Sequence, residues 1–278
     1  MSLKNTLEET YQNGLVFGTS IPLGNIVYTK NDNNEFILLK YNDIGEKEII
    51  VPREFKEISD NAFSGNTTLE KVTLSRGIRV IGNNAFRDCV NLKELVTPNT
   101  LISIGESAFR NCKSLKNFKQ NGSRGLKISD YAFASCESLK RVTLNNVESI
   151  GKLAFCDNTS LKMFQLLGVT SKLASLSSSA FEGTTDIRLL DLRGLTDKIP
   201  SELFMYNNNI YLIKLDGKLK EVSRCAFMNC TIRKVVFYEP KGSKHILLIE
   251  GGNSAFSRAD WFSYDAAIDK ETHLEVKK

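Results

Sequence analysis

The sequence predicts an α/β repeat solenoid that is rich in β-strand, with one strand and one short helical or 3-10 turn in each repeat. Two observations predict this fold. The dipeptide Ala-Phe recurs along the 278-residue chain with 22 to 29 residues between successive phenylalanines, and apolar residues keep nearly constant distances from each phenylalanine. A period near 23 residues indicates a solenoid, because a unit of that size buries its apolar face only when neighbouring units stack on it.

The repeated phenylalanine is the fixed point of each unit, and one of them follows leucine instead of alanine. The repeated positions are Phe63, Phe86, Phe109, Phe133, Phe155, Phe181, Phe204, Phe227 and Phe256. An aliphatic residue lies five positions before the phenylalanine in all units but the last. In most units, further apolar residues lie six and nine positions after it. The shared pattern is Ile-Gly-x-x-Ala-Phe-x-x-Cys/Asn-x-x-Leu-x-x-Val-x-Leu.

The strand of each unit is predicted by alternation of apolar and polar residues. In the unit of Phe63, Val72 and Leu74 alternate with Lys71, Thr73 and Ser75. This period of two is typical of a strand with one side toward the core and one toward solvent. We expect these strands to stack on one another along the solenoid.

The segment from Ile81 to Phe86 is expected to turn the chain. Gly82 suits a bend in the backbone. Ala85 is small enough to allow neighbouring coils to approach closely, and Phe86 is expected to fill the space between them.

Two units carry a clear resemblance to a known family. The segments Ile81-Gly-Asn-Asn-Ala-Phe-Arg-Asp-Cys-Val-Asn-Leu92 and Ile104-Gly-Glu-Ser-Ala-Phe-Arg-Asn-Cys-Lys-Ser-Leu115 resemble the BspA-type leucine-rich repeat, and the match covers about residues 51–256. The resemblance implies a right-handed leucine-rich repeat solenoid that binds other macromolecules, typically on bacterial surfaces and in some protists. It implies no catalytic residue.

The two ends of the chain do not follow the repeat. Residues 1–50 are expected to form an N-terminal cap, with a short amphipathic helix over 3–11 and a hairpin of the runs 25–29 and 35–41. Residues 51–256 form the solenoid of about nine units. Residues 257–278 are expected to close the other end, because a solenoid needs an atypical terminal unit.

One position, three residues after the phenylalanine, holds small polar or polarisable side chains. Its occupants are Asn66, Cys89, Cys112, Cys136, Asn158, Thr184, Asn207 and Cys230. We expect them to point inward and satisfy backbone groups of the turns. The cysteines are interpreted as free structural thiols, because parallel side chains in a ladder rarely meet the dihedral requirement of a disulfide.

The solvent side of the stacked strands is the default binding surface of this architecture. The outward positions include an apolar stripe, Met163, Leu189 and Leu212, flanked by charged residues. The candidate partner-binding residues are Arg141, Met163, Gln165, Leu189, Asp191, Leu212, Lys214 and Lys234. The alternative, that a terminal segment covers the stripe or that it is ordinary surface scatter, stays open at this point.

A basic segment offers a second candidate site. Residues 214–244 contain eight lysines and arginines against three acids, a balance of 8 − 3 = +5, which equals the formal charge of the whole chain, 37 − 32 = +5. Such a segment attracts an anionic glycan, an acidic protein or a nucleic acid. A solvated charged face is the simpler interpretation, and a charge of +5 does not by itself indicate nucleic acid.

Known catalytic and metal-binding motifs are missing from the sequence. It contains no Gly-x-x-x-x-Gly-Lys loop, no Gly-x-Gly-x-x-Gly and no His-Glu-x-x-His, and its two histidines, His245 and His273, lie on different terminal segments. The run from Asn31 to Glu35 lacks the glycine and later glutamate of an EF-hand and is interpreted as a turn. We predict no enzyme activity, no metal and no cofactor.

Two functional hypotheses follow. The first is a non-enzymatic scaffold that binds a protein or glycan through the solvent face of the strands. The second is a structural or self-assembly module, or an anion binder that uses residues 214–244. No apolar run is long enough to cross a bilayer. The compartment stays open, because the family suggests the cell surface, whereas free cysteines and the polar start of the chain suggest the cytoplasm.

Overall fold

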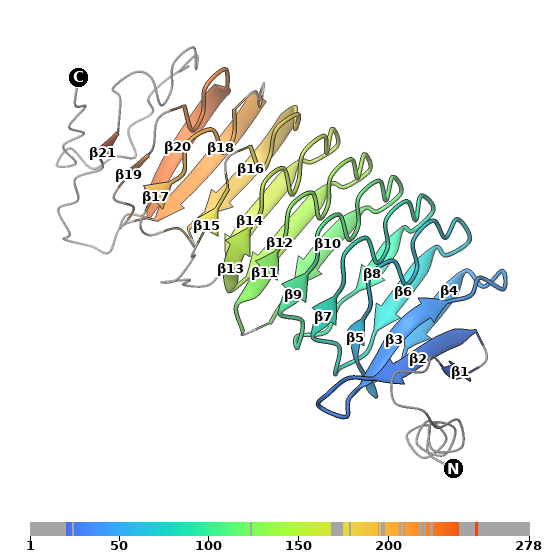
Figure 1. The fold of residues 1–278 in the computed structure, drawn as a ribbon. Coiled ribbons are helices and arrows are strands. Elements are labelled where there is room, and N and C mark those ends of the chain that lie inside the picture. Colours follow the sequence, from blue (N-terminus) through green and yellow to red (C-terminus); the bar gives the residue numbers. More distant parts are fainter. Residues whose placement is uncertain are drawn as a thin grey trace.

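The computed structural model is a β-solenoid whose coils stack in single file (Figure 1). It describes residues 21–23, 25–122, 124–167, 175–177, 179–193, 195, 198–205, 207, 209–216, 219, 221–222, 225–238 and 248–249. The described part makes about eight turns, one for each phenylalanine from Phe63 to Phe227. The predicted helix over 3–11, the ninth unit and the C-terminal cap lie outside these residues.

Each coil contributes one strand to the first side of the solenoid. These strands pair in parallel, in two sheets that meet between the third and fourth strands. The first sheet contains β4 (Glu48–Val51), β6 (Lys71–Leu74) and β8 (Glu94–Val96), and the second contains β10 (Asn117–Gln120), β12 (Arg141–Asn145), β14 (Met163–Leu167), β16 (Asp186–Leu192), β18 (Asn209–Asp216) and β20 (Thr231–Tyr238). We call the outward surface of these nine strands the strand face.

A second strand in each coil forms the opposite side. These strands are short and also pair in parallel from coil to coil, the first six in one group and the last three in another. They are β5 (Phe55–Ile58), β7 (Val80–Ile81), β9 (Ser103–Ile104), β11 (Leu126–Ile128), β13 (Val147–Ile150), β15 (Ser175–Leu176), β17 (Lys198–Ile199), β19 (Glu221–Val222) and β21 (Leu248–Ile249).

The segments expected to be short helices are turns instead, and this part of the prediction is wrong. The described residues contain no helix and no 3-10 turn. The residue two positions before each phenylalanine has a left-handed backbone, with φ of 53° to 59° from Asn61 to Cys225, and such a residue ends a helix. Alternate backbone N–H groups donate to the next coil, as Phe63 does to the Ala85 carbonyl at 2.7 Å, while those between them, such as Ser64 to Asn61 at 3.1 Å, close turns three residues back. The described part of the chain is therefore a β-solenoid built from strands and turns.

The repeated phenylalanines form one continuous stack through the core, as predicted. Successive rings from Phe63 to Phe227 have centroids 4.7 to 5.4 Å apart and lie within 21° of parallel. The alanine before each ring, or Leu203 in the case of Phe204, is also buried. In the strand from Lys71 to Leu74, Val72 and Leu74 are buried and the alternate residues are half-exposed, which confirms the predicted alternation.

Gly82 has a different role from the predicted bend. Its φ lies outside the left-handed region, but a Cβ at this position would lie 2.5 Å from Asp60 Oδ1 and 2.6 Å from the Asp60 nitrogen. Gly105 and Gly151 meet the preceding coil at similar distances. The glycine is required because two backbones approach closely.

An antiparallel hairpin precedes the first coil. β1 (Ile21–Leu23), β2 (Ile26–Lys30) and β3 (Phe36–Tyr41) pair in order, and β3 then pairs in parallel with β5. The predicted hairpin is confirmed. Edge-to-face contacts among Tyr28, Phe36 and Phe55, with centroids 5.7 to 6.4 Å apart, cover the end of the core.

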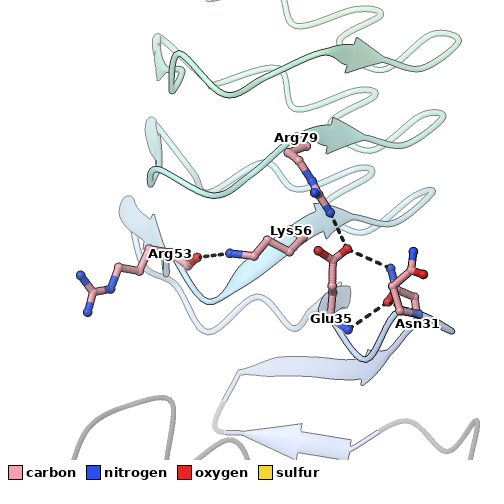
Figure 2. Close-up of polar contacts among 6 residues, drawn as sticks. Asn31, Glu35, Arg53, Lys56 and Arg79 are labelled. Carbon is pink, nitrogen blue, oxygen red and sulfur yellow. Dashed lines mark hydrogen bonds and ion pairs between the residues drawn. The ribbon is translucent and has the colours of Figure 1, made fainter.

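Polar contacts hold the hairpin turn against the coils (Figure 2). Asn31 Oδ1 accepts from the Glu35 backbone N–H at 2.9 Å, so the segment is a turn, as predicted. The Arg79 guanidinium in the corner before β7 forms an ion pair with the Glu35 carboxylate. Nearby, Lys56 Nζ donates to the Arg53 carbonyl at 3.2 Å. The ion pair of Arg79 therefore ties the hairpin turn to the coil of β7, while the Lys56 bond lies within its own segment.

Candidate functional site

The parallel register places the outward side chains of the strand face in two rows. Residues paired through the sheet from β10 to β20 share a row, because in-register parallel strands align residues that point the same way. The first row is Asn117, Arg141, Met163, Leu189, Leu212 and Lys234, and the second is Lys119, Thr143, Gln165, Asp191, Lys214 and Val236. All eight candidate residues lie in these rows, on the five successive strands from β12 to β20.

The predicted apolar stripe exists as a row but is less exposed than a free patch. Met163, Leu189 and Leu212 are half-buried, and Gln165 and Lys214 beside them are half-buried as well. Arg141 is exposed. Lys234 is placed only by its backbone pairing with Leu212 in β20.

Asp191 is not the solvent-exposed flanking charge that the sequence suggested. Its side chain is fully buried, and both carboxylate oxygens accept from the Arg193 guanidinium at 2.8 Å. Arg193 lies two residues further along, on the same side of the chain, and can therefore fold over the carboxylate. A buried carboxylate requires such a partner, and Arg193 is the charge nearest to solvent at this point.

A hollow lies at the start of β16 and β18 and was not predicted from the sequence. It has a volume of about 360 Å³ and is lined by Asp186, Arg188, Asn209 and Tyr211, whose side chain is 57% exposed. The strands β16 and β18 begin earlier in their repeats than β12 and β14 do. The alternation in Asp186-Ile-Arg188 and Asn209-Ile-Tyr211 is the sequence signal that could have indicated it.

The second row continues onto the first sheet with exposed apolar residues. Ile50, Thr73 and Val96 share this row through the register of β4, β6 and β8. Ile50 is 70% exposed and Val96 is 40% exposed. Ile50 was not among the outward residues predicted from the sequence, because it precedes the first complete repeat.

The inward polar position behaves as predicted. Cys89, Cys112 and Cys136 each donate from Sγ to the phenylalanine carbonyl of the preceding coil at 3.1 Å, and Asn158 makes the same contact through Nδ2 at 3.0 Å. All six cysteines are free. Burial raises the thiol pKa of Cys89 and Cys136 to about 12, so these thiols stay protonated and are poor nucleophiles.

The basic segment 214–244 lies largely outside the described residues. Lys214 is in β18, and Arg233 and Lys234 are in β20. Lys218, Lys220, Arg224, Lys241 and Lys244 fall outside the described ranges. Within the described ranges, no group of three or more His, Cys, Asp and Glu side chains is arranged to hold a metal ion. Nor does any helix there have the length and apolarity to span a membrane.

Comparison with known proteins supports the same architecture. The family model described as the BspA-type leucine-rich repeat region, in six copies, matches residues 41–162 and 126–258. A leucine-rich repeat protein of T. pallidum is 22% identical, with a TM-score of 0.50 over 72% of this chain and 87% of that one. One from Bacteroides ovatus is 18% identical, with a TM-score of 0.49 over 82% and 64%. No curated protein matches the sequence.

Proposed function

The chain belongs to the BspA-type leucine-rich repeat family, and on that premise we propose that it is a non-enzymatic scaffold that binds a protein partner through the strand face. The observation that carries this proposal is the register of the second sheet. Six consecutive strands, β10 to β20, present their outward side chains in two continuous rows.

The strand face is the broadest regular surface of the described solenoid. Its strands reach eight residues in β18 and β20, whereas β7, β9, β17 and β19 on the opposite side have only two. In the turns around the phenylalanines, which form the turn side, alternate backbone N–H groups are used for bonds between coils. A wide sheet surface with half-buried apolar residues among polar ones suits protein recognition, because interface cores combine apolar contact with a polar surround.

The chemistry of the repeat cysteines supports binding rather than catalysis. A nucleophilic thiol needs a lowered pKa and access to solvent. In Cys112 burial raises the thiol pKa well above its ordinary value, and the side chain is fully buried. The cysteines at the inward polar position therefore stabilise the core of the solenoid.

Site-specific photo-crosslinking tests the proposal. A photoreactive amino acid is placed at Thr143 or Gln165, both half-buried on the strand face, and in a control variant at Lys152, an exposed residue on the turn side. Each full-length variant is irradiated in the cells that produce the protein. We expect protease-sensitive adducts from the two strand-face positions and none from Lys152.

Two outcomes would contradict the proposal. Equal adducts from Lys152 and the strand-face positions would show that binding is not confined to this face. Adducts that resist protease but are cleaved by periodate would identify a glycan as the ligand of the strand face.

A further inference from the structure

A patch of four exposed cations lies on the strand face where β10 and β12 pair. Lys116 and Lys140 directly precede the two strands, and their main chains are joined by a hydrogen bond from the Lys140 N–H to the Lys116 carbonyl at 2.8 Å. Lys119 and Arg141 lie within the strands, in the second and first rows. All four side chains are exposed. We call Lys116, Lys119, Lys140 and Arg141 the basic patch.

The lysines on both sides of the basic patch are neutralised by acidic partners. Lys93 forms an ion pair with Glu70 and Lys162 one with Asp186, both at 2.6 Å. On the first sheet, Lys71 in β6 pairs with Glu94 in β8 at 3.3 Å. Each of these three lysines is therefore paired with an acid on an adjacent coil.

The basic patch differs from its surroundings because it has no internal counter-charge. Among the described residues, none of its four cations has an ion-pair partner, and neither β10 nor β12 contains an acidic residue. Lys116 and Lys140 lie on adjacent coils, whose backbones are about 4.8 Å apart. Like charges placed in this way repel each other. The patch thus concentrates positive potential, which attracts an anionic ligand.

The residues around the basic patch indicate which kind of anion it fits. Asn117 and Thr143 lie beside the cations, and Phe118 in β10 is buried, so no exposed aromatic ring is available there to stack a nucleic-acid base. Three of the four cations are lysines, which lack the bidentate geometry of an arginine cluster for phosphate. Along the first row the patch leads directly to the half-buried Met163, Leu189 and Leu212. Charged groups beside apolar contact area are typical of a protein interface.

From this arrangement we infer that the basic patch binds an acidic polypeptide segment of a protein partner, whose neighbouring apolar residues pack on Met163, Leu189 and Leu212. This inference rests on the proposed function, because it assigns a partner chemistry to the strand face. Attraction across such a patch raises the rate of association and makes binding depend on salt.

Binding of labelled poly-L-glutamate of about 20 residues, measured by fluorescence anisotropy at two salt concentrations, tests the inference. The test variant of the full chain is Lys116→Glu, Lys119→Glu, Lys140→Glu and Arg141→Glu. The matched control reverses four exposed cations outside the strand face, Lys40, Arg76, Arg124 and Lys152, for the same change in net charge. Circular dichroism verifies that both variants are folded.

We expect the wild-type chain to bind the peptide, more weakly at higher salt, and the patch variant to bind at least about tenfold more weakly. The control variant should remain within about threefold of wild type at 150 mM salt, where distant charges are screened. Absence of wild-type binding, or an equal loss in both variants, would overturn the inference. Tighter binding of a heparin oligosaccharide or of oligo-dT of matched charge would also overturn it, because another class of polyanion would then be preferred.

The crosslinking experiment separates failure of this inference from failure of the proposed function. If adducts from Gln165 persist in the patch variant, the strand face binds a protein without an acidic segment at the patch. If the adducts and peptide binding are lost together, the partner is held through the basic patch.

Discussion

Two kinds of glycine contribute to the solenoid at the scale of single residues. A Cβ at Gly105 would lie 2.6 Å from the Asn83 nitrogen and the Gly82 carbonyl carbon of the preceding coil. Gly65 has a left-handed backbone, with φ of 73°, and no atom within 4 Å of its added Cβ. The first is required by contact between coils and the second only by backbone conformation.

Substitution of the two glycines by alanine should separate these causes. Gly105→Ala is expected to lower the free energy of unfolding by about 2 kcal/mol or more, because the clash is with backbone. Gly65→Ala should cost about 1 kcal/mol, the strain of a left-handed alanine. Urea denaturation of both variants measures the difference, and a larger loss for Gly65→Ala would contradict this account of coil contact.

The buried thiols make stability depend on pH in the alkaline range. In the unfolded chain a thiol has its ordinary pKa of 9.0, whereas burial raises the pKa of Cys89 and Cys136 to about 12 in the folded chain. Their contribution to stability is complete below pH 9 and is lost as the pH rises toward 12, because only the unfolded chain releases these protons early. The loss approaches about 1.4 kcal/mol per pH unit for each thiol within that interval.

Denaturation curves between pH 8 and 10.5 should show this decrease in the free energy of unfolding. Cys136→Ala should be less stable at pH 8 but should decline less steeply, since it lacks one of the buried thiols. The comparison of slopes removes the titration of lysines that both proteins share. Equal slopes would show that Cys136 does not carry the predicted shift.

At the scale of elements, the phenylalanine stack joins each coil to its neighbours. The Phe133 ring lies 5.1 Å from Phe109 and 5.2 Å from Phe155, nearly parallel to both, and 4.5 Å from Phe118. Its side chain has no exposed surface. Removal of this ring would leave a cavity between two coils.

Phe133→Ala is therefore expected to lower the free energy of unfolding by about 3–5 kcal/mol. Tyr211→Ala, which removes a ring that is 57% exposed on the strand face, should change it by less than about 0.5 kcal/mol. Chemical denaturation measures both values. Similar losses in the two variants would mean that the stack is not the main stabilising feature of the coil.

Gln120 occupies an inward position at the end of β10, where β6, β12 and β14 have Leu74, Leu144 and Leu166. Its Nε2 donates to the Leu101 carbonyl at 3.3 Å, but its buried Oε1 has no hydrogen-bond partner. A buried acceptor without a partner is destabilising. It lies beside the interruption between β8 and β10, where the Thr97 hydroxyl donates to the Lys119 carbonyl at 2.7 Å.

Gln120→Leu should raise the free energy of unfolding by about 1 kcal/mol, because it replaces an unsatisfied amide by the side chain that other coils use. Gln165→Leu, on the outward side of β14, serves as the control and should stay within about 0.5 kcal/mol of wild type. A rise in the thermal midpoint for the first variant alone would support this account. A fall would show that the bond to Leu101 outweighs the unsatisfied oxygen.

At the scale of the whole molecule, each coil contacts mainly the coils before and after it, so a defect should spread only locally. Hydrogen exchange followed by mass spectrometry can test this in Phe133→Ala. Faster exchange is expected in the coils of Phe109, Phe133 and Phe155, with near wild-type rates around Phe63. A uniform increase along the chain would show that the solenoid opens as one cooperative unit.

The repeat made most of the fold predictable. Spacing and apolarity identified the phenylalanine stack, the inward polar position and the outward rows of the strand face, because these positions recur in every coil. The conformation of the turn was not predictable in this way, and the expected short helix is not formed. The reason is that the N–H groups of residues such as Phe63 bond to the next coil rather than within their own segment. Asp191 was misplaced because its burial depends on Arg193, which the repeat pattern does not include.

The sequence by itself determined that the chain forms a repeat solenoid and which side chains of each coil face the core, because the alternation of apolar residues records those directions. Only the tertiary structure decided which charges on the strand face are neutralised. Lys93 and Lys162 find acids on adjacent coils, while Lys116, Lys119, Lys140 and Arg141 do not. The physical reason is that ion pairing depends on the register between residues more than twenty positions apart, and that register is set by the stacking of coils.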